Sequence, residues 1–342
     1  MKKRIILAIV VLIVITEIIL RLGFRKDLDF TGTPTVYQYD PILNYVYIPD
    51  SKFVKNGEEI WINKQGFIGP DFLEKDSNNY RIAIIGSSWV SGPNHLLEYY
   101  SFPPVLEKIC NENGYQVQVL NCGVDGGERS NQLLKSIKYQ ILEFAPDMIL
   151  FESNNFPLYD SNIVRETYRG VNIFYPYNNV ESKEDVKKQV NGFLKYRELI
   201  RIIHLSYILR VGIKFYMRYD LQNRATYYIR AHQSNCWHSW GNEQNELPME
   251  QSVKLILDMK EALSSQNISF FLFQYHKNSD IISIARKNKL PLISLNNSFT
   301  TDDHYYKDGH LNQNGCEKVA KEIFRVLKEN KLIPDKYTQK GK

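Results

Sequence analysis

Short apolar segments alternate with amphipathic ones from residue 81 onward, and this alternation constrains the fold more than any other feature. Each apolar segment has the length of a β-strand and lacks polar alternation, which indicates strands buried on both faces. The five segments are Ile82–Ile85, Val117–Leu120, Met148–Phe151, Ser269–Phe273 and Leu290–Ile293. Three stretches have helical spacing, namely Phe102–Ile109, Gln132–Phe144 and Gly315–Leu327. The pattern predicts a three-layer α/β/α domain with about five parallel strands.

The composition fits one large domain, or one domain with an insertion. The chain has 342 residues, of which 43% are hydrophobic, so it can bury a substantial core. The formal net charge of +5 is spread along the sequence and gives no reason to expect a nucleic-acid partner. No zinc-finger pattern, Walker loop or glycine-rich dinucleotide fingerprint occurs.

The N-terminus differs from the rest of the chain. Lys2-Lys3-Arg4 precedes an apolar stretch, Ile5–Leu22, that only three polar residues interrupt. A helix of about 20 residues spans the hydrocarbon layer of a membrane. No small-residue cleavage site follows, so we expect residues 1–26 to be an uncleaved single-pass anchor and not a cleaved signal peptide. The basic cluster favours a cytoplasmic N-terminus and an extracytoplasmic body.

Two further regions stand outside the strand and helix alternation. Residues 27–79 are rich in turn-forming residues and tyrosine, which indicates a lead-in of loops and a hairpin before the main domain at 80–335. Residues 157–247 interrupt the main domain, and we interpret them as an inserted cap. Within the cap, residues 196–219 have a helical pattern with five basic side chains. These side chains could contact anionic headgroups or an acidic glycan, or simply face water.

Cysteine and histidine spacing gives no sign of a metal site. We expect small buried thiols and not disulfides, because the four cysteines show no C-x-x-C pair; they are Cys110, Cys122, Cys236 and Cys316. A metal site at His232, Cys236 and His238 would lack a fourth ligand at a recognised spacing. We therefore expect neither a metal nor a cofactor.

Ser88 directly follows the first predicted strand, in the sequence Gly86-Ser87-Ser88-Trp89. Ligands of parallel α/β sheets gather at the carboxyl ends of the strands, so this position suits a catalytic residue. A serine hydroxyl becomes a nucleophile when a neighbouring base removes its proton. The alternative is that the Gly-Ser-Ser turn only caps the next helix.

His310 lies between a loop and the last predicted helix and is the candidate base. Imidazole titrates in the range that general-base catalysis at neutral pH requires. Asp308, two positions earlier, is close enough in sequence to orient the ring and stabilise the imidazolium. The alternative is that Asp308-Gly309 forms a turn and His310 begins the helix.

The second and third strands end in segments that could face Ser88, residues 121–127 and 152–155. Acyl transfer develops negative charge on the carbonyl oxygen, and each fixed N–H donor aimed at that oxygen contributes on the order of 3 kcal/mol. We predict that Gly126, Asn154 and the N–H of Ser88 form this oxyanion hole. A turn would equally explain the glycine, and a helix cap the asparagine.

Taken together, the segments around Ser88, Gly126, Asn154 and His310 resemble the four blocks of the SGNH/GDSL hydrolase family. Ile62–Phe67 also resembles the lead-in of membrane-anchored bacterial members. The resemblance covers roughly residues 60–155 and 250–330. It implies a flavodoxin-like sheet, a serine nucleophile at Ser88, an oxyanion hole from Ser88, Gly126 and Asn154, and a base at His310.

The chain departs from the family pattern in three places. Ser87 stands where the family usually has an aspartate, and Glu152 and Asn155 replace the glycine and aspartate that flank the block-three asparagine. The aspartate precedes the histidine by two positions and not three. Asp302 and Asp303 are therefore the alternatives to Asp308 as the acid of the triad.

The sequence thus predicts a membrane-tethered, extracytoplasmic serine esterase of the SGNH type. Its substrate would be an O-acyl ester, most simply an acetyl group, on a small molecule or a cell-surface glycan. One alternative is an O-acyltransferase that passes the same acyl group from Ser88 to a glycan hydroxyl. Another is a non-catalytic scaffold that keeps the fold and binds a wall polymer.

Overall fold

The computed structural model places the chain in two compact units. One contains residues 36–164 and 242–342, and the other contains residues 1–35 and 165–241. The structure describes residues 2–23, 36–55, 58–92, 101–125, 129–154, 156–161, 163–168, 171–176, 180–194, 206, 208, 236–238, 244–275, 279–295, 299–304 and 310–338.

The larger unit is built on a five-stranded parallel sheet. Its strands are β5 (Tyr80–Gly86), β6 (Val117–Gly123), β7 (Met148–Glu152), β13 (Ser269–Gln274) and β14 (Leu292–Ser294). Their order across the sheet is β6-β5-β7-β13-β14, and every neighbouring pair is parallel. This is the flavodoxin-like order, in which the second strand of the chain lies outside the first. All five predicted strands are present, and the predicted α/β class with a parallel five-stranded sheet is confirmed.

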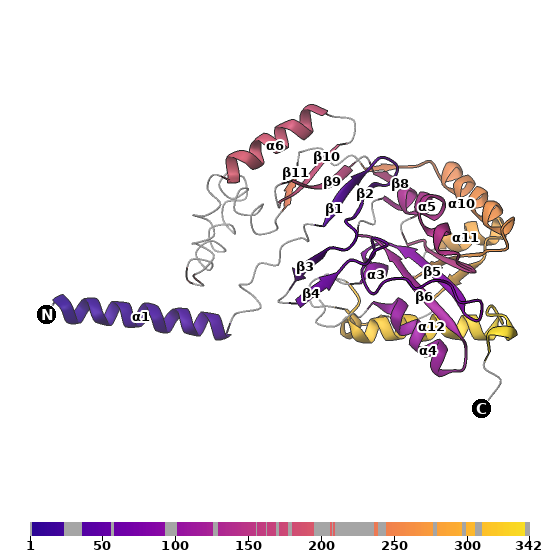
Figure 1. The fold of residues 1–342 in the computed structure, drawn as a ribbon, viewed down its shortest axis with the longest axis horizontal. Coiled ribbons are helices and arrows are strands. Elements are labelled where there is room, and N and C mark those ends of the chain that lie inside the picture. Colours follow the sequence, from indigo (N-terminus) through magenta and orange to yellow (C-terminus); the bar gives the residue numbers. More distant parts are fainter. Residues whose placement is uncertain are drawn as a thin grey trace. The chain divides into compact units, whose positions relative to one another are not determined.

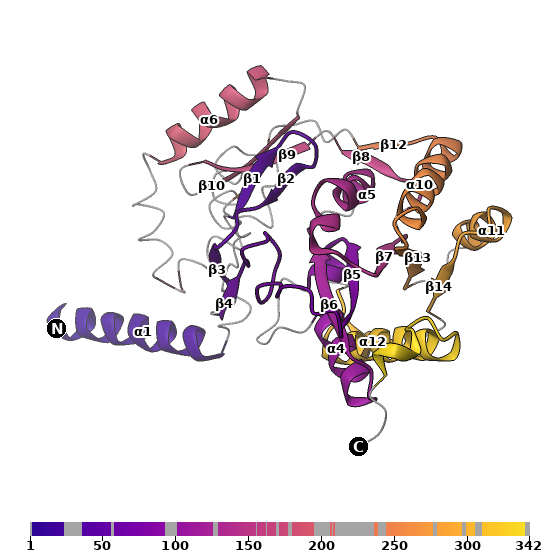
Figure 2. The same cartoon turned by 45° about the vertical axis from the view of Figure 1, so that its right-hand side comes forward.

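Helices cover both faces of the sheet, as Figures 1 and 2 show. They are α4 (Phe102–Glu112) and α12 (Gln313–Glu329) on one face, and α5 (Ser130–Tyr139) and α10 (Met249–Ser264) on the other. Ile82 and Ile84 pack into the core beneath α4 and α12, whereas Ala83 and Ile85 pack beneath α5 and α10. Every residue of β5 is buried, which explains why this strand is apolar from Ile82 to Ile85.

Smaller elements surround this core. The helical ones are α3 (Ser88–Ser91), η2 (Ile141–Phe144), α11 (Ser279–Lys287), η3 (Thr301–Asp303) and η4 (Asp335–Tyr337). The strands form three antiparallel pairs: β1 (Tyr37–Asp40) with β2 (Asn44–Tyr47), β3 (Lys52–Lys55) with β4 (Glu58–Trp61), and β8 (Tyr159–Ser161) with β12 (Gln244–Glu246). The lead-in therefore contributes two hairpins to the larger unit.

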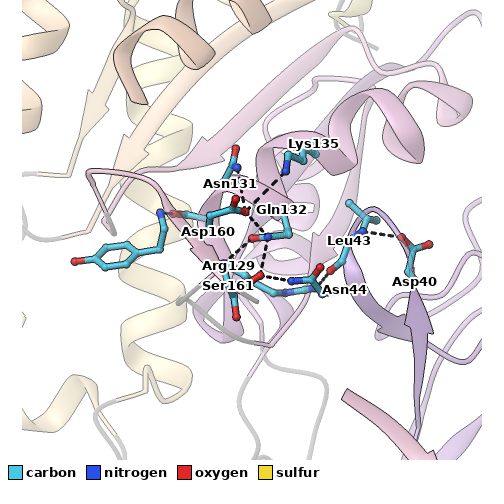
Figure 3. Close-up of polar contacts among 11 residues, drawn as sticks. Asp40, Leu43, Asn44, Arg129, Asn131, Gln132, Lys135, Asp160 and Ser161 are labelled. Atoms are coloured by element: carbon cyan, nitrogen blue, oxygen red, sulfur yellow. Dashed lines mark hydrogen bonds and ion pairs between the residues drawn. The ribbon is translucent and has the colours of Figure 1, made fainter. Parts of the chain in front are cut away.

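Polar side chains fasten β8 to the first turns of α5 (Figure 3). Asp160 accepts hydrogen bonds from the side-chain amides of Asn131 and Gln132, and its carboxylate lies 3.8 Å from the amino group of Lys135. The carbonyl of Ser161 accepts a second bond from Gln132 at 3.0 Å. These contacts fix the start of α5, which directly follows the loop that leaves β6.

The smaller unit contains a three-stranded sheet and two helices. Its elements are α1 (Lys2–Gly23), β9 (Ile163–Tyr168), β10 (Val171–Pro176), α6 (Val180–Leu194) and β11 (Cys236–His238). The strand order is β11-β10-β9, and the side chains of Val186 and Val190 on α6 are buried. The predicted basic helix at 196–219 and His232 lie outside the described residues. The predicted boundaries of the anchor, lead-in and cap stay predictions.

The predicted anchor region forms helix α1, whose apolar side chains are exposed; that of Leu22 is 81% exposed. The carboxylate of Glu17 on this helix accepts hydrogen bonds from the Ser206 hydroxyl at 3.0 Å and from the Ile208 N–H at 3.1 Å. Among the residues described, no helix has both the length and the apolar character that crossing a membrane requires. The predicted transmembrane segment is therefore not supported.

Three of the four cysteines are buried free thiols, as predicted: Cys110, Cys122 and Cys316. Burial raises the pKa of Cys110 and of Cys316 to about 12 and also raises that of Cys122. These thiols therefore stay protonated at neutral pH and contribute to packing.

Gly123 at the end of β6 allows the sheet to approach α3. It pairs in register with Gly86 of β5, and a Cβ at position 123 would lie 2.1 Å from the backbone nitrogen of Ser91. We expect Gly123→Ala to lower the free energy of unfolding by about 1–3 kcal/mol, because the backbone of α3 must shift. Urea denaturation measures this change.

The matched control is Lys138→Ala on the exposed side of α5, which should change stability by less than about 0.5 kcal/mol. An unchanged urea midpoint for Gly123→Ala would show that α3 does not approach β6 this closely.

Candidate active site

The strand order places the topological switch point of the sheet between β5 and β7. The chain leaves β5 toward β6 on one side and leaves β7 toward β13 on the other, so the connections diverge at this point. Open α/β sheets bind ligands in the crevice that such divergence creates at the carboxyl ends of the strands. Ser88 follows β5 and Asn154 follows β7, so both lie at this edge.

Ser88 and His310 meet there. Nε2 of His310 lies 2.8 Å from Oγ of Ser88, although the two residues are 222 positions apart in the sequence. When Nε2 carries no proton, the hydroxyl of Ser88 donates to it, which is the geometry that a general base needs to activate a nucleophile. Both side chains are only partly buried, so a substrate can reach them.

The two serines of the turn make different contacts through their hydroxyls. Ser87 is the N-cap of α3, and its hydroxyl accepts a hydrogen bond from the N–H of Trp89 at 3.5 Å. Ser88 is the first residue of α3, so its hydroxyl remains available to His310. The capping alternative weighed for this turn thus holds for Ser87, and it does not compete with a reactive role for Ser88.

Two predicted oxyanion donors are described, and each has an N–H to offer. The N–H of Ser88 lies in the first turn of α3 and has no acceptor among the described residues. The side chain of Asn154 accepts from the N–H of Tyr275 at 2.9 Å and donates one N–H to Glu152 at 3.2 Å, which leaves its second N–H. The third predicted donor, Gly126, lies outside the described residues.

The residue before Gly126 is held by buried tyrosines of the first hairpin. Asp125 accepts hydrogen bonds from the hydroxyls of Ser91 at 3.0 Å and Tyr37 at 3.0 Å through its carboxylate, and from Tyr45 at 2.7 Å through its carbonyl. Tyr47 accepts from the N–H of Asp125 at 3.4 Å, and burial raises the pKa of this tyrosine well above its usual value. The hairpin thereby fixes one end of segment 126–128.

Arg129 fixes the other end of the same segment (Figure 3). Its guanidinium is buried and donates through Nη1 to the carbonyls of Leu43 and Tyr45, both at 2.7 Å. It also lies 3.8 Å from the centre of the Tyr45 ring, within cation–π distance. The β1–β2 hairpin therefore holds both ends of the segment that contains Gly126.

The segment that carries His310 is anchored by Asn312. This residue is the N-cap of α12; its Oδ1 accepts from the N–H of Gly315 at 3.2 Å. Its Nδ2 donates to the carbonyls of Asp302 at 2.7 Å and His304 at 3.2 Å. These bonds tie residues 302–304 to Asn312 and hold His310 close to the start of α12. The predicted acid, Asp308, lies outside the described residues.

The two alternative acids have other surroundings. The carboxylate of Asp303 accepts hydrogen bonds from the N–H and hydroxyl of Thr300, at 2.7 and 3.1 Å, and from Lys318 at 2.7 Å. None of these bonds reaches His310, and Asp303 instead ties the loop to α12. Asp302 is exposed to solvent.

Sequence reasoning assigned no role to three residues that line this site. The ring of Trp89 lies 6.3 Å from that of His310 and 5.0 Å from that of Tyr275, measured between centroids. Glu152 is buried and accepts the N–H of Ser87 at 2.6 Å. The sequence signals for Glu152 were its acidic side chain at the end of an otherwise apolar strand and its place where the family has a glycine.

No family model and no curated protein matches the chain. Several solved structures are similar to it, among them a GDSL-like lipase from Bacteroides thetaiotaomicron, with 10% identity, 75% of this chain and 92% of that chain covered, and a TM-score of 0.35. A lipase/acylhydrolase from Enterococcus faecalis has 14% identity, 73% and 96% coverage, and a TM-score of 0.36. A family 3 carbohydrate esterase from Clostridium thermocellum has 12% identity, 74% and 96% coverage, and a TM-score of 0.38. Similarity at this level carries no functional argument, so the function has to be inferred from the geometry of the site itself.

The Asp303 carboxylate makes a pH-dependent contribution to stability. Burial alone would raise the pKa of Asp303, but hydrogen bonds from Lys318 and Thr300 outweigh burial and hold it below 3.8. Its contribution is therefore complete above pH 3.8 and is lost as the pH falls through the folded-state pKa. We expect Asp303→Asn to destabilise the protein by about 1–3 kcal/mol at pH 7 and by less at pH 3, as measured by urea unfolding.

Asp71→Asn removes an exposed ion pair with Lys64 and serves as the control, with little change expected at pH 7. A stability difference between wild type and Asp303→Asn that stays constant from pH 7 to pH 3 would contradict the assignment of Asp303 to this ion pair.

Proposed function

We propose that this protein is a serine esterase of the SGNH type that hydrolyses O-acyl esters. The contact of 2.8 Å between the hydroxyl of Ser88 and Nε2 of His310 is the observation that supports this most directly. The position of this pair at the carboxyl edge of a flavodoxin-like sheet, where Asn154 follows the neighbouring strand β7, adds to it.

In the proposed reaction, Oγ of Ser88 attacks the carbonyl carbon of the ester while Nε2 of His310 takes the hydroxyl proton. The carbonyl oxygen becomes an oxyanion, which accepts hydrogen bonds from the N–H of Ser88 and the free amide N–H of Asn154. The C–O bond to the alcohol breaks, and His310 returns its proton to the departing oxygen. Water then attacks the acyl-serine while His310 takes its proton, the bond between the acyl carbon and Oγ of Ser88 breaks, and His310 returns the proton to Oγ as the carboxylic acid leaves.

Gly126 as a third oxyanion donor and Asp308 as the acid that orients His310 remain part of the proposal. Asp125 and Arg129 support the first role, since they fix both ends of segment 126–128. The second role is supported by sequence distance, because Asp308 lies two positions from His310, and by the contacts that commit Asp303 to Lys318 and Thr300.

For the substrate we propose an acetyl ester on a cell-surface glycan. The ring of Trp89 beside His310 supports this, because an aromatic face packs well against the apolar face of a sugar ring. Such a substrate would place the acetyl carbonyl at Ser88 and the sugar against Trp89.

Labelling with a fluorophosphonate probe tests the esterase directly. We expect the wild type to be labelled, Ser88→Ala to be unlabelled, and the matched control Ser87→Ala to keep the label, because the Ser87 hydroxyl caps α3 at 3.5 Å and contacts Glu152, whereas the contact with His310 belongs to Ser88. Hydrolysis of p-nitrophenyl acetate should fall by at least about 10³-fold in Ser88→Ala and in His310→Ala. A wild type that takes no label would instead favour a polymer-binding scaffold.

A second assay distinguishes hydrolysis from acyl transfer. It measures the release of free acetate from p-nitrophenyl acetate by the wild type, with and without an oligosaccharide acceptor. Free acetate at an equal rate in both conditions supports the esterase. Acetylated oligosaccharide in place of free acetate would favour the transferase.

We further propose that α1 holds the protein at a membrane, with the larger unit outside the cytoplasm. Two features support this: the apolar side chains of α1 are exposed, and the sequence of the helix begins with the basic residues Lys2-Lys3-Arg4. Cell fractionation should find the full chain in the membrane pellet after a carbonate wash, and a chain without residues 2–23 in the soluble fraction. Recovery of the full chain in the soluble fraction would contradict the tether.

A further inference from the structure

A buried carboxylate adjoins the turn that carries the nucleophile. Glu152 is the last residue of β7 and is 7% exposed. Its Oε2 accepts the N–H of Ser87 at 2.6 Å, and its Oε1 accepts one N–H of the Asn154 amide at 3.2 Å. One carboxylate therefore connects the residue before the nucleophile with a proposed oxyanion donor.

The packing around Glu152 leaves no room for a side chain at position 86, the last residue of the neighbouring strand β5. A Cβ at Gly86 would lie 2.3 Å from Oε2 of Glu152 and 2.7 Å from its Cβ. Real Cβ atoms do not approach other atoms this closely, so Gly86 is required where β5 passes Glu152. The glycine before the two serines thus makes space for the carboxylate.

The charge of Glu152 has no lysine or arginine partner within the described part of the chain. Burial raises the pKa of Glu152, whereas its bonds to Ser87 and Asn154 and the positive charge of His310 lower it. The other titratable groups nearby are the phenol of Tyr275, which interacts electrostatically with Glu152, and the thiol of Cys316 beside Tyr275. Neither can be a cation, so within the described part of the chain His310 is the group whose positive charge can act on Glu152.

These contacts also connect two departures from the family pattern. The resemblance places an aspartate at position 87 and a glycine at position 152, and this chain has Ser87 and Glu152. The structure brings the two positions into contact, with the carboxylate of Glu152 on the N–H of Ser87. An acidic group thus remains at the nucleophile turn, although it comes from β7 and not from the turn itself.

We propose that Glu152 is a positioning residue for the esterase reaction, an inference that rests on the proposed function. It holds the turn of Ser87 and Ser88 and the amide of Asn154 in fixed relation, so that nucleophile and oxyanion donor face the same carbonyl group. Its negative charge also stabilises His310 in the protonated form that arises when Ser88 attacks.

Glu152→Gln tests this with almost no change in shape. A glutamine oxygen can accept from Ser87 or from Asn154, but its NH₂ then faces the other donor, so one hydrogen bond and the charge are lost. We expect kcat for p-nitrophenyl acetate to fall by about 10- to 100-fold, as a small displacement of reacting groups does, with KM changed less than about 3-fold. The rate of fluorophosphonate labelling should fall in parallel.

The pH profile gives a readout that a purely structural role would not move. Without the carboxylate the imidazolium of His310 is less favoured, so the acid limb of the kcat/KM profile should move to lower pH in Glu152→Gln. Glu152→Asp keeps the charge and shortens the side chain. It should restore the position of the acid limb while kcat stays below that of the wild type.

Glu107 offers a matched control. It is a partly buried carboxylate on α4 whose pKa burial also raises, and it accepts one backbone N–H, that of Val119, at 2.6 Å. It has no contact with Ser88, His310 or Asn154. Glu107→Gln should lower the urea midpoint and leave kcat and the pH profile of the folded enzyme unchanged.

The outcomes separate the two proposals. An active, labelled wild type with a slow, pH-shifted Glu152→Gln supports the role of Glu152. An active wild type whose Glu152→Gln variant behaves like Glu107→Gln overturns that role and leaves the esterase intact. A wild type that is neither labelled nor active overturns the esterase, and the role of Glu152 falls with it. If Glu152→Gln does not fold, Glu152→Asp decides, since an unchanged kcat in that variant overturns the proposal.

Discussion

The parallel direction of the five central strands is the constraint on which the whole site depends. Because all five strands run the same way, their carboxyl ends lie at one edge, and residues from distant parts of the chain emerge together there. Ser88 follows β5 and Asn154 follows β7, and the chain reaches His310 only after β14. A hydrogen bond across 222 positions of sequence is therefore a local event in the fold.

Rigid elements hold each part of this edge in place. Two glycines let β5 and β6 approach Glu152 and α3 closely, and the backbone nitrogen of Ser87 in the turn is held by the side chain of Glu152 from β7. The β1–β2 hairpin contributes Tyr37 and Tyr45, whose hydroxyls hold Asp125. Sites supported in this way keep reacting groups within the small tolerances that acyl transfer requires.

The sequence allowed the sheet and the contact between Ser88 and His310 to be predicted, and the physical reason is the same in both cases. Strands buried on both faces are largely apolar, which made β5 and β7 recognisable, and ligand-binding residues of parallel sheets follow such strands at their carboxyl ends. The supporting contacts were not predictable. Glu152 meets Ser87 only because β5 and β7 are neighbours, and Lys318 meets Asp303 only because α12 returns past η3. Pairings of this kind follow no fixed spacing along the chain. The apolar N-terminal run predicted a membrane span that the structure does not support, since the length of an apolar run alone does not determine its surroundings.

Helix-capping residues and the proposed reactive residues are close neighbours in this chain, because both occur where a strand or loop becomes a helix. The first turn of a helix has N–H groups without intrahelical partners, so a polar residue must accept from them. Ser87 accepts at the start of α3, so the hydroxyl of the next residue, Ser88, is left for His310, and the N–H of Ser88 has no acceptor among the described residues. Asn312 accepts at the start of α12, and His310 lies two residues before it. The structural and the catalytic explanations of these motifs are therefore not alternatives: the caps fix the backbone, and the fixed backbone presents the neighbouring side chains to each other.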